Sequence, residues 1–316
     1  THPMFARRHP THGPEGLEEL IMSRIYTPGA LPREPSPRFF EPQVHQAVTH
    51  LRSGFGVALK GARGSGRSTL LNEVVEELER TGTTVIAVKG MPLLDDHPLI
   101  SLEAVVPGRL SPDISPADMA DRLAKQLYTQ TDVVIALDDI ADIDQTTLGV
   151  LHQVPSRLGI PVVLTEDLHP GFRSTRAAQL AGLWTSTTIS LSPLRYDQME
   201  ELLHSILEAP VEEDVIGQVL SKSAGNPGLG KVLALTGRLY GNIAMHDDKW
   251  SLTTTSLWHD DLSTIVESMI PELDDDVLES LFSCGLLGPS HASRLENLLP
   301  SRHLRTLERL GLVVLV

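Results

Sequence analysis

The segment from Gly61 to Thr69 constrains the fold of this chain more than any other part of its sequence. It reads Gly-Ala-Arg-Gly-Ser-Gly-Arg-Ser-Thr and matches the pattern G-x-x-x-x-G-K-[ST], except that arginine stands at the lysine position. An apolar stretch at 55–60 precedes it, and apolar residues at helical spacing follow it up to Gly82. Strand, glycine loop and helix in this order are typical of a loop whose backbone N–H groups surround phosphate. The alternative is a glycine-rich turn in an ordinary α/β protein.

The loop sequence indicates which residues contact a nucleotide and how the arginine at position 67 affects hydrolysis. Lysine holds the β- and γ-phosphates as a compact charge, whereas arginine is a longer planar fork. Arginine still binds phosphate, often through two hydrogen bonds, but it is less suited to follow a γ-phosphoryl group during transfer. We therefore expect ATP or ADP to bind while hydrolysis is slow or lost. The expected contacts come from seven loop residues: Gly61, Gly64, Ser65, Gly66, Arg67, Ser68 and Thr69.

A second candidate element is the apolar run 133–137, which is followed directly by Asp138 and Asp139. Open α/β sheets bind their ligands at the carboxyl ends of the strands, where these two carboxylates would lie. We expect Asp138 to hold Mg²⁺ together with the Ser68 hydroxyl, and Asp139 to position or deprotonate an attacking water. The alternative is a solvated turn after a strand.

Further candidates lie after the next strand and between two helices. Thr165 ends the apolar run 161–164 and is expected to face the γ-phosphate, while Arg173 and Arg176 follow as candidates for an added positive charge. Pro227, in Gly-Asn-Pro, is rigid and apolar and suited to pack on a purine ring. The simpler interpretation of Pro227 is the end of one helix and the start of the next.

The chain divides into four expected parts. Residues 1–37 are rich in proline, histidine, arginine and glycine, which is typical of an arm or linker. Residues 38–192 alternate apolar strands with helices and predict an α/β P-loop NTPase domain, with a parallel sheet sandwiched by helices. Residues 193–250 carry three amphipathic helical patterns and predict a helical lid. Residues 251–316 end in two short helices and a strand pattern, which suits a winged-helix domain.

Composition limits the partners of this chain. It has 41 acidic and 26 basic residues, for a net charge of -15, and an acidic chain repels DNA. The basic residues within 251–316 are all on the last two helical patterns: Arg294, Arg302, Arg305 and Arg309. The single cysteine, Cys284, excludes an internal disulfide, and no apolar run reaches about 18 residues. We expect a cytoplasmic protein without a membrane span, and further chain after its apolar last residues.

Together these elements resemble the STAND-class NTPases, and most closely the nucleotide-binding region of large ATP-binding LuxR-type transcription regulators. The resemblance spans about residues 39–316 and rests on the loop, on Asp138-Asp139, on 189–194 and on 223–227. It implies a switch in which ADP locks the domains together, and exchange for ATP with a small-molecule or protein inducer permits self-association. It also implies that Pro227 touches adenine and that His303 or His291 reaches the ADP phosphates. DNA contact is expected through a domain that this chain lacks.

Three departures from this family pattern lie on the catalytic side of the predicted site. Arginine replaces lysine at position 67, Ile-Ala-Asp-Ile follows the acidic pair at 140–143, and Glu166 follows Thr165. They favour a nucleotide-gated regulatory module whose hydrolysis is slow or lost. Two other functions stay open, namely a degenerate nucleotide-binding fold that serves as a scaffold for protein interaction, and an active AAA+-like ATPase that acts on DNA.

Overall fold

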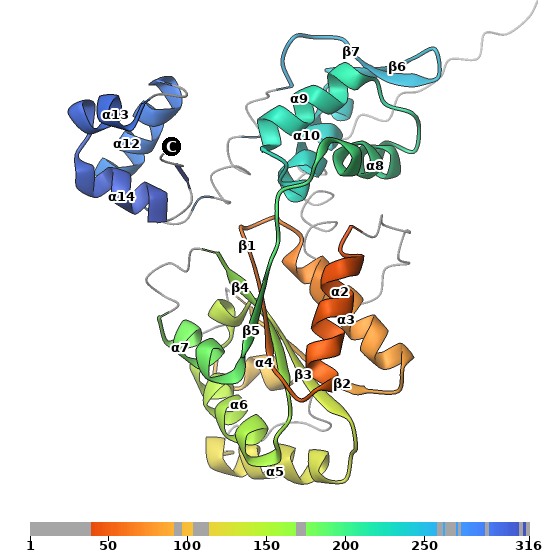
Figure 1. The fold of residues 1–316 in the computed structure, drawn as a ribbon, viewed down its shortest axis with the longest axis vertical. Coiled ribbons are helices and arrows are strands. Elements are labelled where there is room, and N and C mark those ends of the chain that lie inside the picture. The colour runs from red at the N-terminus through yellow and green to blue at the C-terminus, as the bar shows by residue number, and fades with distance from the viewer. Residues whose placement is uncertain are drawn as a thin grey trace, which may run out of the picture. The chain divides into compact units, whose positions relative to one another are not determined.

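A computed structural model describes most of the chain after the N-terminal arm. The described residues are 39–91, 97–103, 114–168, 175–257, 262, 270, 273–287, 291–309 and 312–313. The arm expected at 1–37 and the candidate Arg173 lie outside them. The described chain forms a sheet with flanking helices, a group of helices with a hairpin, and a C-terminal group of helices (Figure 1).

Five parallel strands form the sheet, in the order β2-β3-β4-β1-β5. β1 lies between β4 and β5, so Leu59 pairs with Thr165 on one side and Ile189 on the other. The predicted parallel sheet is confirmed. The strands are β1 Val57–Gly61, β2 Thr84–Lys89, β3 Val133–Asp138, β4 Val162–Asp167 and β5 Thr187–Ser190.

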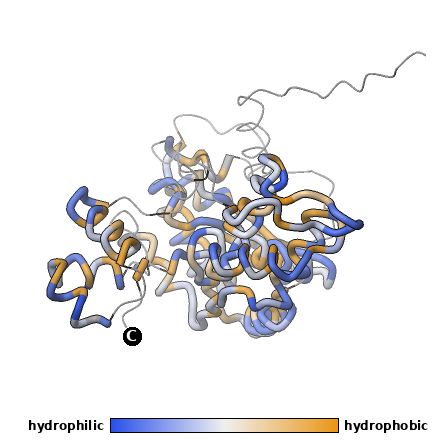
Figure 2. The backbone as a smooth tube through the Cα atoms, turned by 90° about the horizontal axis from the view of Figure 1, so that it is seen from above, coloured by the Kyte–Doolittle hydropathy of each residue, from blue (hydrophilic) through white to orange (hydrophobic). Residues whose placement is uncertain are grey.

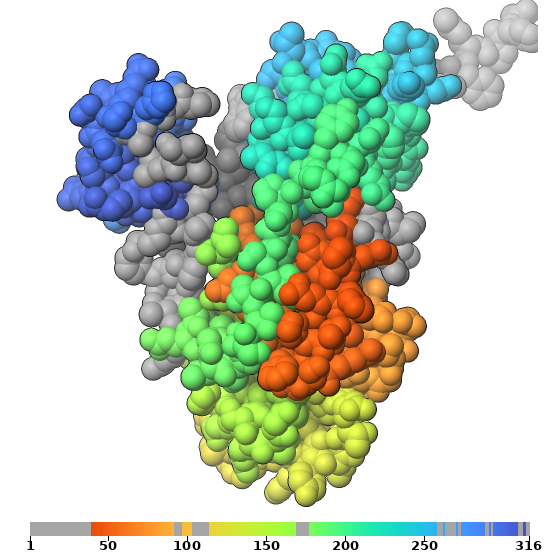
Figure 3. Space-filling model, viewed as in Figure 1, coloured from red at the N-terminus to blue at the C-terminus, as the bar shows by residue number. Residues whose placement is uncertain are grey.

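Helices cover both faces of this sheet, as the continuous apolar strands predict. Successive side chains of a strand point to opposite faces, so Ile135 joins the cluster under α5 and α6, whereas Val134 and Ala136 join the cluster under α2 and α3. In Figure 3 the red atoms at the surface belong to the part of the chain that contains α2. The helices of this part are α2 Glu41–Arg52, α3 Arg67–Arg80, α4 Ile100–Glu103, α5 Pro116–Tyr128, the 3₁₀ turn η1 Ile140–Asp142, α6 Gln145–Leu158 and α7 Thr175–Trp184.

The longer helices are amphipathic, with one face buried. On α3 the buried residues are Leu70, Leu71, Val74 and Leu78, at helical spacing. Figure 2 shows hydrophilic and hydrophobic residues alternating along the helical tubes. No helix within the described ranges is both long enough and apolar enough to cross a membrane.

Three helices and a hairpin follow the sheet and share one hydrophobic cluster. They are α8 Tyr196–Leu207, α9 Glu213–Ser223, α10 Pro227–Leu239, β6 Ile243–His246 and β7 Lys249–Leu252. The hairpin was not predicted, and it spans the domain boundary expected at residue 250. Its turn consists of Asp247 and Asp248, both in the left-handed region, and an Asp-Asp pair is a weaker hairpin signal than Asn-Gly or Asp-Gly. The backbone N–H of Trp250 donates to the Pro210 carbonyl, and this bond joins the hairpin to the chain before α9.

The C-terminal group contains α12 Asp275–Leu287, α13 Ala292–Leu298 and α14 Ser301–Arg309. The last two helices agree with the two short helices expected near the end of 251–316, and Leu295, Leu304 and Leu307 are buried. The strand expected after Gly311 lies outside the described residues, apart from positions 312–313. A winged helix therefore stays a prediction for this part.

Candidate functional site

The glycine loop joins β1 to α3 and takes the shape that its sequence predicts. Gly64 and Gly66 have φ angles of 79° and 95°, in the left-handed region that favours glycine. Gly66 is also the N-cap residue of α3. A Cβ atom at Gly66 would lie only 2.9 Å from the Phe40 ring. Backbone shape and the neighbouring Phe40 therefore both require glycine at position 66.

Ser65 gives the loop an unpaired polar group. It is buried, at 9% exposure, and its hydroxyl has no hydrogen-bond partner among the described residues. A Cβ atom at Gly61 would collide with this hydroxyl, so the absence of a side chain there makes room for it. A buried hydroxyl without a partner is unfavourable. It is well suited to donate to a phosphate oxygen.

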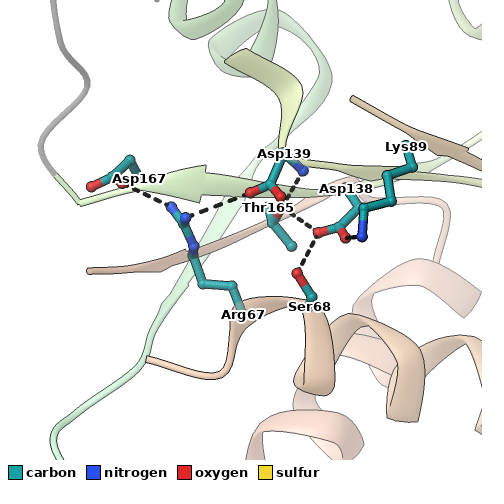
Figure 4. A network of polar contacts seen from close by, with 7 residues as sticks. All are labelled: Arg67, Ser68, Lys89, Asp138, Asp139, Thr165 and Asp167. Atoms are coloured by element: carbon teal, nitrogen blue, oxygen red, sulfur yellow. Dashed lines mark hydrogen bonds and ion pairs between the residues drawn. The ribbon is translucent and has the colours of Figure 1, made fainter. Parts of the chain in front are cut away.

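A hydrogen-bonded network connects the start of α3 to the ends of β3 and β4 (Figure 4). The Ser68 hydroxyl donates to Asp138 Oδ1 at 2.9 Å, and the Thr165 hydroxyl donates to the same oxygen at 2.9 Å. Thr165 in turn accepts from the Asp139 N–H at 2.7 Å and is fully buried. The structure thus brings Ser68 and Asp138 together as the sequence predicts. Thr165 holds both aspartates in place, and its hydroxyl is already donating and accepting.

Arg67, which stands at the lysine position, is held by two carboxylates. Its Nη2 lies 3.5 Å from Asp139 Oδ1 and its Nη1 lies 3.3 Å from Asp167 Oδ2, and its side chain is only 11% exposed. Asp167 was not identified from the sequence. It ends β4, so the rule that ligands gather at the carboxyl ends of parallel strands could have found it.

Lys89 adds a second cation to this network. It ends β2, and its Nζ lies 3.7 Å from Asp138 Oδ2 (Figure 4). Lys89, like Asp167, is the polar last residue of a parallel strand, so the same rule could have found it. Arg67 and Lys89 therefore face three carboxylates, those of Asp138, Asp139 and Asp167.

Asp139 sits in an environment that disfavours its charge. Burial is the largest cause that raises the pKa of this carboxyl above its ordinary value of 3.8, and the neighbouring Asp138 charge raises the pKa further. Arg67 opposes this shift in part. The backbone of Asp139 is also left-handed, with φ 48°. Asp139 is thus a carboxyl that retains its proton more readily than an exposed aspartate.

We expect Asp139→Asn to gain stability relative to wild type as the pH rises above about 4. The folded chain binds a proton at Asp139 more tightly than the unfolded chain does, so the stability from this group is lost as pH rises through its folded pKa. Urea unfolding at a series of pH values checks this. Asp248→Asn, at another left-handed but exposed aspartate, is the matched control. If the stability difference between Asp139→Asn and wild type stays constant with pH, the pKa of Asp139 is not raised in the folded chain.

The first turn of α10 contacts the loop directly. Asn226 caps α10 by accepting from the Leu229 N–H, and its Nδ2 donates to the Arg63 carbonyl at 2.8 Å. The Gly228 N–H donates to the Gly64 carbonyl at 2.9 Å. Pro227, the predicted purine contact, is the first residue of α10 and therefore lies beside the loop.

Asn226→Asp separates these two roles of the side chain. Aspartate caps a helix as well as asparagine does, but it places an oxygen opposite the Arg63 carbonyl. We expect hydrogen exchange of the peptide covering 227–230 to quicken by about tenfold, since the lost bond and the new repulsion are worth about 1–2 kcal/mol. Asn226→Ala, which loses the cap as well, should exchange faster still. Unchanged hydrogen exchange in Asn226→Asp would show that the hydrogen bond to the loop does not stabilise the first turn of α10.

Within the described part of the chain, the other candidate residues have no contact with this network. Arg176 is the second residue of α7, but its side chain is not described. His303 is buried, with Nδ1 2.8 Å from the Ser280 hydroxyl and Nε2 accepting from Arg302 Nε at 3.2 Å. Both ring nitrogens of His303 thus have partners on α12 and α14. His291 is the exposed N-cap residue of α13.

The chemistry of Ser68 and Asp138 fits a magnesium ion. Mg²⁺ prefers oxygen ligands, and proteins usually hold it with one or two carboxylates, the rest being phosphate oxygens and water. The described residues contain no group of three or more His, Cys, Asp or Glu side chains that could hold a metal. The site therefore suits an ion that comes with a phosphate ligand rather than one held by protein alone.

Comparisons with known proteins identify the fold. No family model and no curated protein match the sequence. The Aeropyrum pernix ORC2 protein, solved as ADPNP–ADP complexes, is 18% identical with a TM-score of 0.57, over 92% of this chain and 90% of that one. A Thermotoga maritima RuvB branch-migration motor matches at 16% identity with a TM-score of 0.44, over 81% and 80%. The likeness to the Aeropyrum protein, together with the parallel sheet, shows a P-loop NTPase fold.

Proposed function

We propose that this chain binds ATP or ADP at the loop of residues 61–69 and acts as the nucleotide-gated switch of a bacterial transcription regulator. The hydrogen bond between Ser68 and Asp138 carries this proposal, because it joins two residues 70 positions apart at the mouth of the loop. A hydroxyl and a carboxylate in this arrangement are the protein ligands that P-loop NTPases use for Mg²⁺. The P-loop NTPase fold shared with the Aeropyrum protein supports the same assignment.

Each residue of the site has a distinct task in this proposal. The loop backbone and the N-terminus of α3 hold the phosphates, and the Ser65 hydroxyl gains its missing partner there. Arg67 contributes a planar, permanent charge to the phosphates. Ser68 and Asp138 would hold Mg²⁺, which when bound neutralises phosphate charge. Thr165 fixes the orientation of Asp138, and Pro227 packs on the adenine ring.

Slow or absent hydrolysis follows from the surroundings of Arg67 and Asp139. The carboxylate that would position an attacking water is ion-paired to the residue in the lysine position, at 3.5 Å. The Arg67 charge favours the ionised form of Asp139 and so weakens this carboxylate as a base toward water. The guanidinium is likewise shared with Asp167, so a γ-phosphate competes with two carboxylates for it.

The proposed switch acts through the contact between the loop and α10. Residues 193–250 form the helical lid, and Asn226 and Gly228 hold its α10 against the loop carbonyls. In this proposal residues 251–316 act as a winged-helix part. In the proposed cycle ADP stabilises the closed arrangement, and ATP with a small-molecule or protein inducer permits self-association. DNA contact occurs through a further domain, and the protein works in the cytoplasm.

Nucleotide binding and turnover measured side by side test this proposal. We expect purified protein to bind a fluorescent ADP analogue and to hydrolyse ATP at least about 100-fold more slowly than the ~1 s⁻¹ that marks the low end of typical enzymes. Arg67→Lys should raise the turnover, and Ser68→Ala should weaken binding of ATP in the presence of Mg²⁺. Rapid turnover stimulated by DNA would instead support an active AAA+-like ATPase.

One observation favours a second function, that of a scaffold that no longer binds nucleotide. The two ion pairs of Arg67 satisfy its charge without any phosphate. A site whose charges are paired within the protein can be retained for packing alone. Failure of wild type to bind ADP or ATP, with binding gained in Arg67→Lys, would support this alternative.

A further inference from the structure

Lys89 is placed beside Asp138 by the register of the sheet. β2 and β3 pair in parallel with Lys89 opposite Asp138, so the two side chains leave the carboxyl edge of the sheet together. The Lys89 Nζ lies 3.7 Å from Asp138 Oδ2, and the lysine side chain is 49% exposed (Figure 4). The backbone thus fixes the position of Lys89, while its ammonium group remains accessible to solvent.

Asp138 already has a partner for each oxygen. Its Oδ1 accepts from the Ser68 and Thr165 hydroxyls, and its Oδ2 faces Lys89. A divalent ion bound at this carboxylate would lie close to the ammonium, and like charges at such distances repel. The structure therefore provides a cation of its own at the carboxylate that is expected to hold Mg²⁺.

We propose that Lys89 is a built-in counter-cation of the phosphate site and lets this chain bind nucleoside diphosphates without Mg²⁺. The inference rests on the proposed nucleotide binding and adds a residue and a metal requirement to it. Lysine is a compact charge on a flexible four-carbon stem, so its ammonium can turn from Asp138 toward a phosphate oxygen. Arg67 supplies the second charge from the loop side.

A purely structural ion pair would behave differently. The Lys89 ammonium is half-exposed at 3.7 Å from Asp138, and Asp138 keeps its hydrogen bonds from Ser68 and Thr165 without it, so Lys89→Met should leave the unliganded protein folded. The variant then changes the charge beside the phosphates without changing the fold. Thermal unfolding of each unliganded variant checks this point, and Lys89→Gln serves if Lys89→Met is unstable.

The test is titration with a fluorescent ADP analogue in EDTA and in excess Mg²⁺. We expect the Kd of wild type to differ by less than about threefold between the two buffers, which is under 1 kcal/mol. Lys89→Met should lose about tenfold in affinity in EDTA, the value of one hydrogen bond to a charged group, and should regain most of it with Mg²⁺. Lys89→Arg keeps the charge and should bind in EDTA. Lys125→Met, which removes an exposed lysine on α5, is the matched control and should behave as wild type.

Two results would overturn the role of Lys89 while the proposed function stands. One is wild-type binding that requires Mg²⁺, and the other is equal affinity of Lys89→Met and Lys125→Met in EDTA. Absence of wild-type binding in both buffers would overturn nucleotide binding itself, and the role of Lys89 with it. The three results can be distinguished, because each gives a different combination of wild-type and variant affinities in the two buffers.

Discussion

We expect replacement of Gly66 by alanine to weaken nucleotide binding strongly, whereas Gly82→Ala should leave it intact. Both glycines have nearly the same backbone, with φ 95° at Gly66 and 92° at Gly82, so alanine costs about 1–2 kcal/mol of conformational strain at either site. They differ in what a Cβ atom would meet. At Gly66 it would lie within 2.9–3.0 Å of the Phe40 ring, and at Gly82 nothing lies within 4 Å. Only the first substitution must shift the loop at the N-terminus of α3.

Equilibrium titration with a fluorescent nucleotide measures this difference. We expect a loss of about 100-fold or more for Gly66→Ala, because displaced loop amides no longer meet the phosphate oxygens together. Urea unfolding of both variants separates loss of binding from loss of stability. Equal affinities for Gly66→Ala and Gly82→Ala would mean that the loop does not form the binding site.

Asp144→Ala should lower the free energy of unfolding by about 3–4 kcal/mol, among the largest effects of a single polar residue in this chain. Asp144 caps α6 by accepting from the Thr147 N–H at 2.8 Å, and it is only 1% exposed. It also accepts from the Leu99 and Ser101 N–H groups, which lie more than forty positions earlier in the chain. Alanine leaves these buried donors unpaired, and each lost bond to a charged acceptor costs about 1.5–3 kcal/mol before relaxation.

Ser115→Ala provides the matched comparison for this prediction. Ser115 caps α5 through the Asp118 N–H at 3.1 Å, but at an exposed position. Loss of such a cap costs about 1 kcal/mol. Denaturant unfolding of both variants gives the two losses directly. Equal losses would show that the bonds from Asp144 to the 97–103 segment add nothing to stability.

The sheet could be predicted because its central strands β1, β3 and β4 are buried on both faces. The runs at 133–137 and 161–164 are wholly apolar, and in the structure their residues divide between the two hydrophobic clusters. The contact between Ser68 and Asp138 could be predicted for a related reason. The carboxyl ends of parallel strands meet at one edge, beside the loop that leaves β1.

The rest of the site depends on strand order and side-chain direction, which the pattern does not contain. Lys89 meets Asp138 only because β2 is the neighbour of β3, and Asp167 meets Arg67 only because β4 is the neighbour of β1. The pattern predicts Thr165 to face a phosphate, but in the structure its hydroxyl is engaged with both aspartates. The hairpin at Asp247-Asp248 was missed because its turn lacks glycine.

Thermal unfolding with and without nucleotide tests the central claim most directly. A ligand that binds only the folded chain stabilises it by about 2.7 kcal/mol at 100 times its Kd. For a chain of this size each kcal/mol raises the Tm by about 2–4 °C, so ADP and ATP should each raise the Tm of wild type by several degrees. The shift should be lost in Gly66→Ala and kept in Gly82→Ala. A Tm of wild type that neither ADP nor ATP changes would contradict nucleotide binding at this loop.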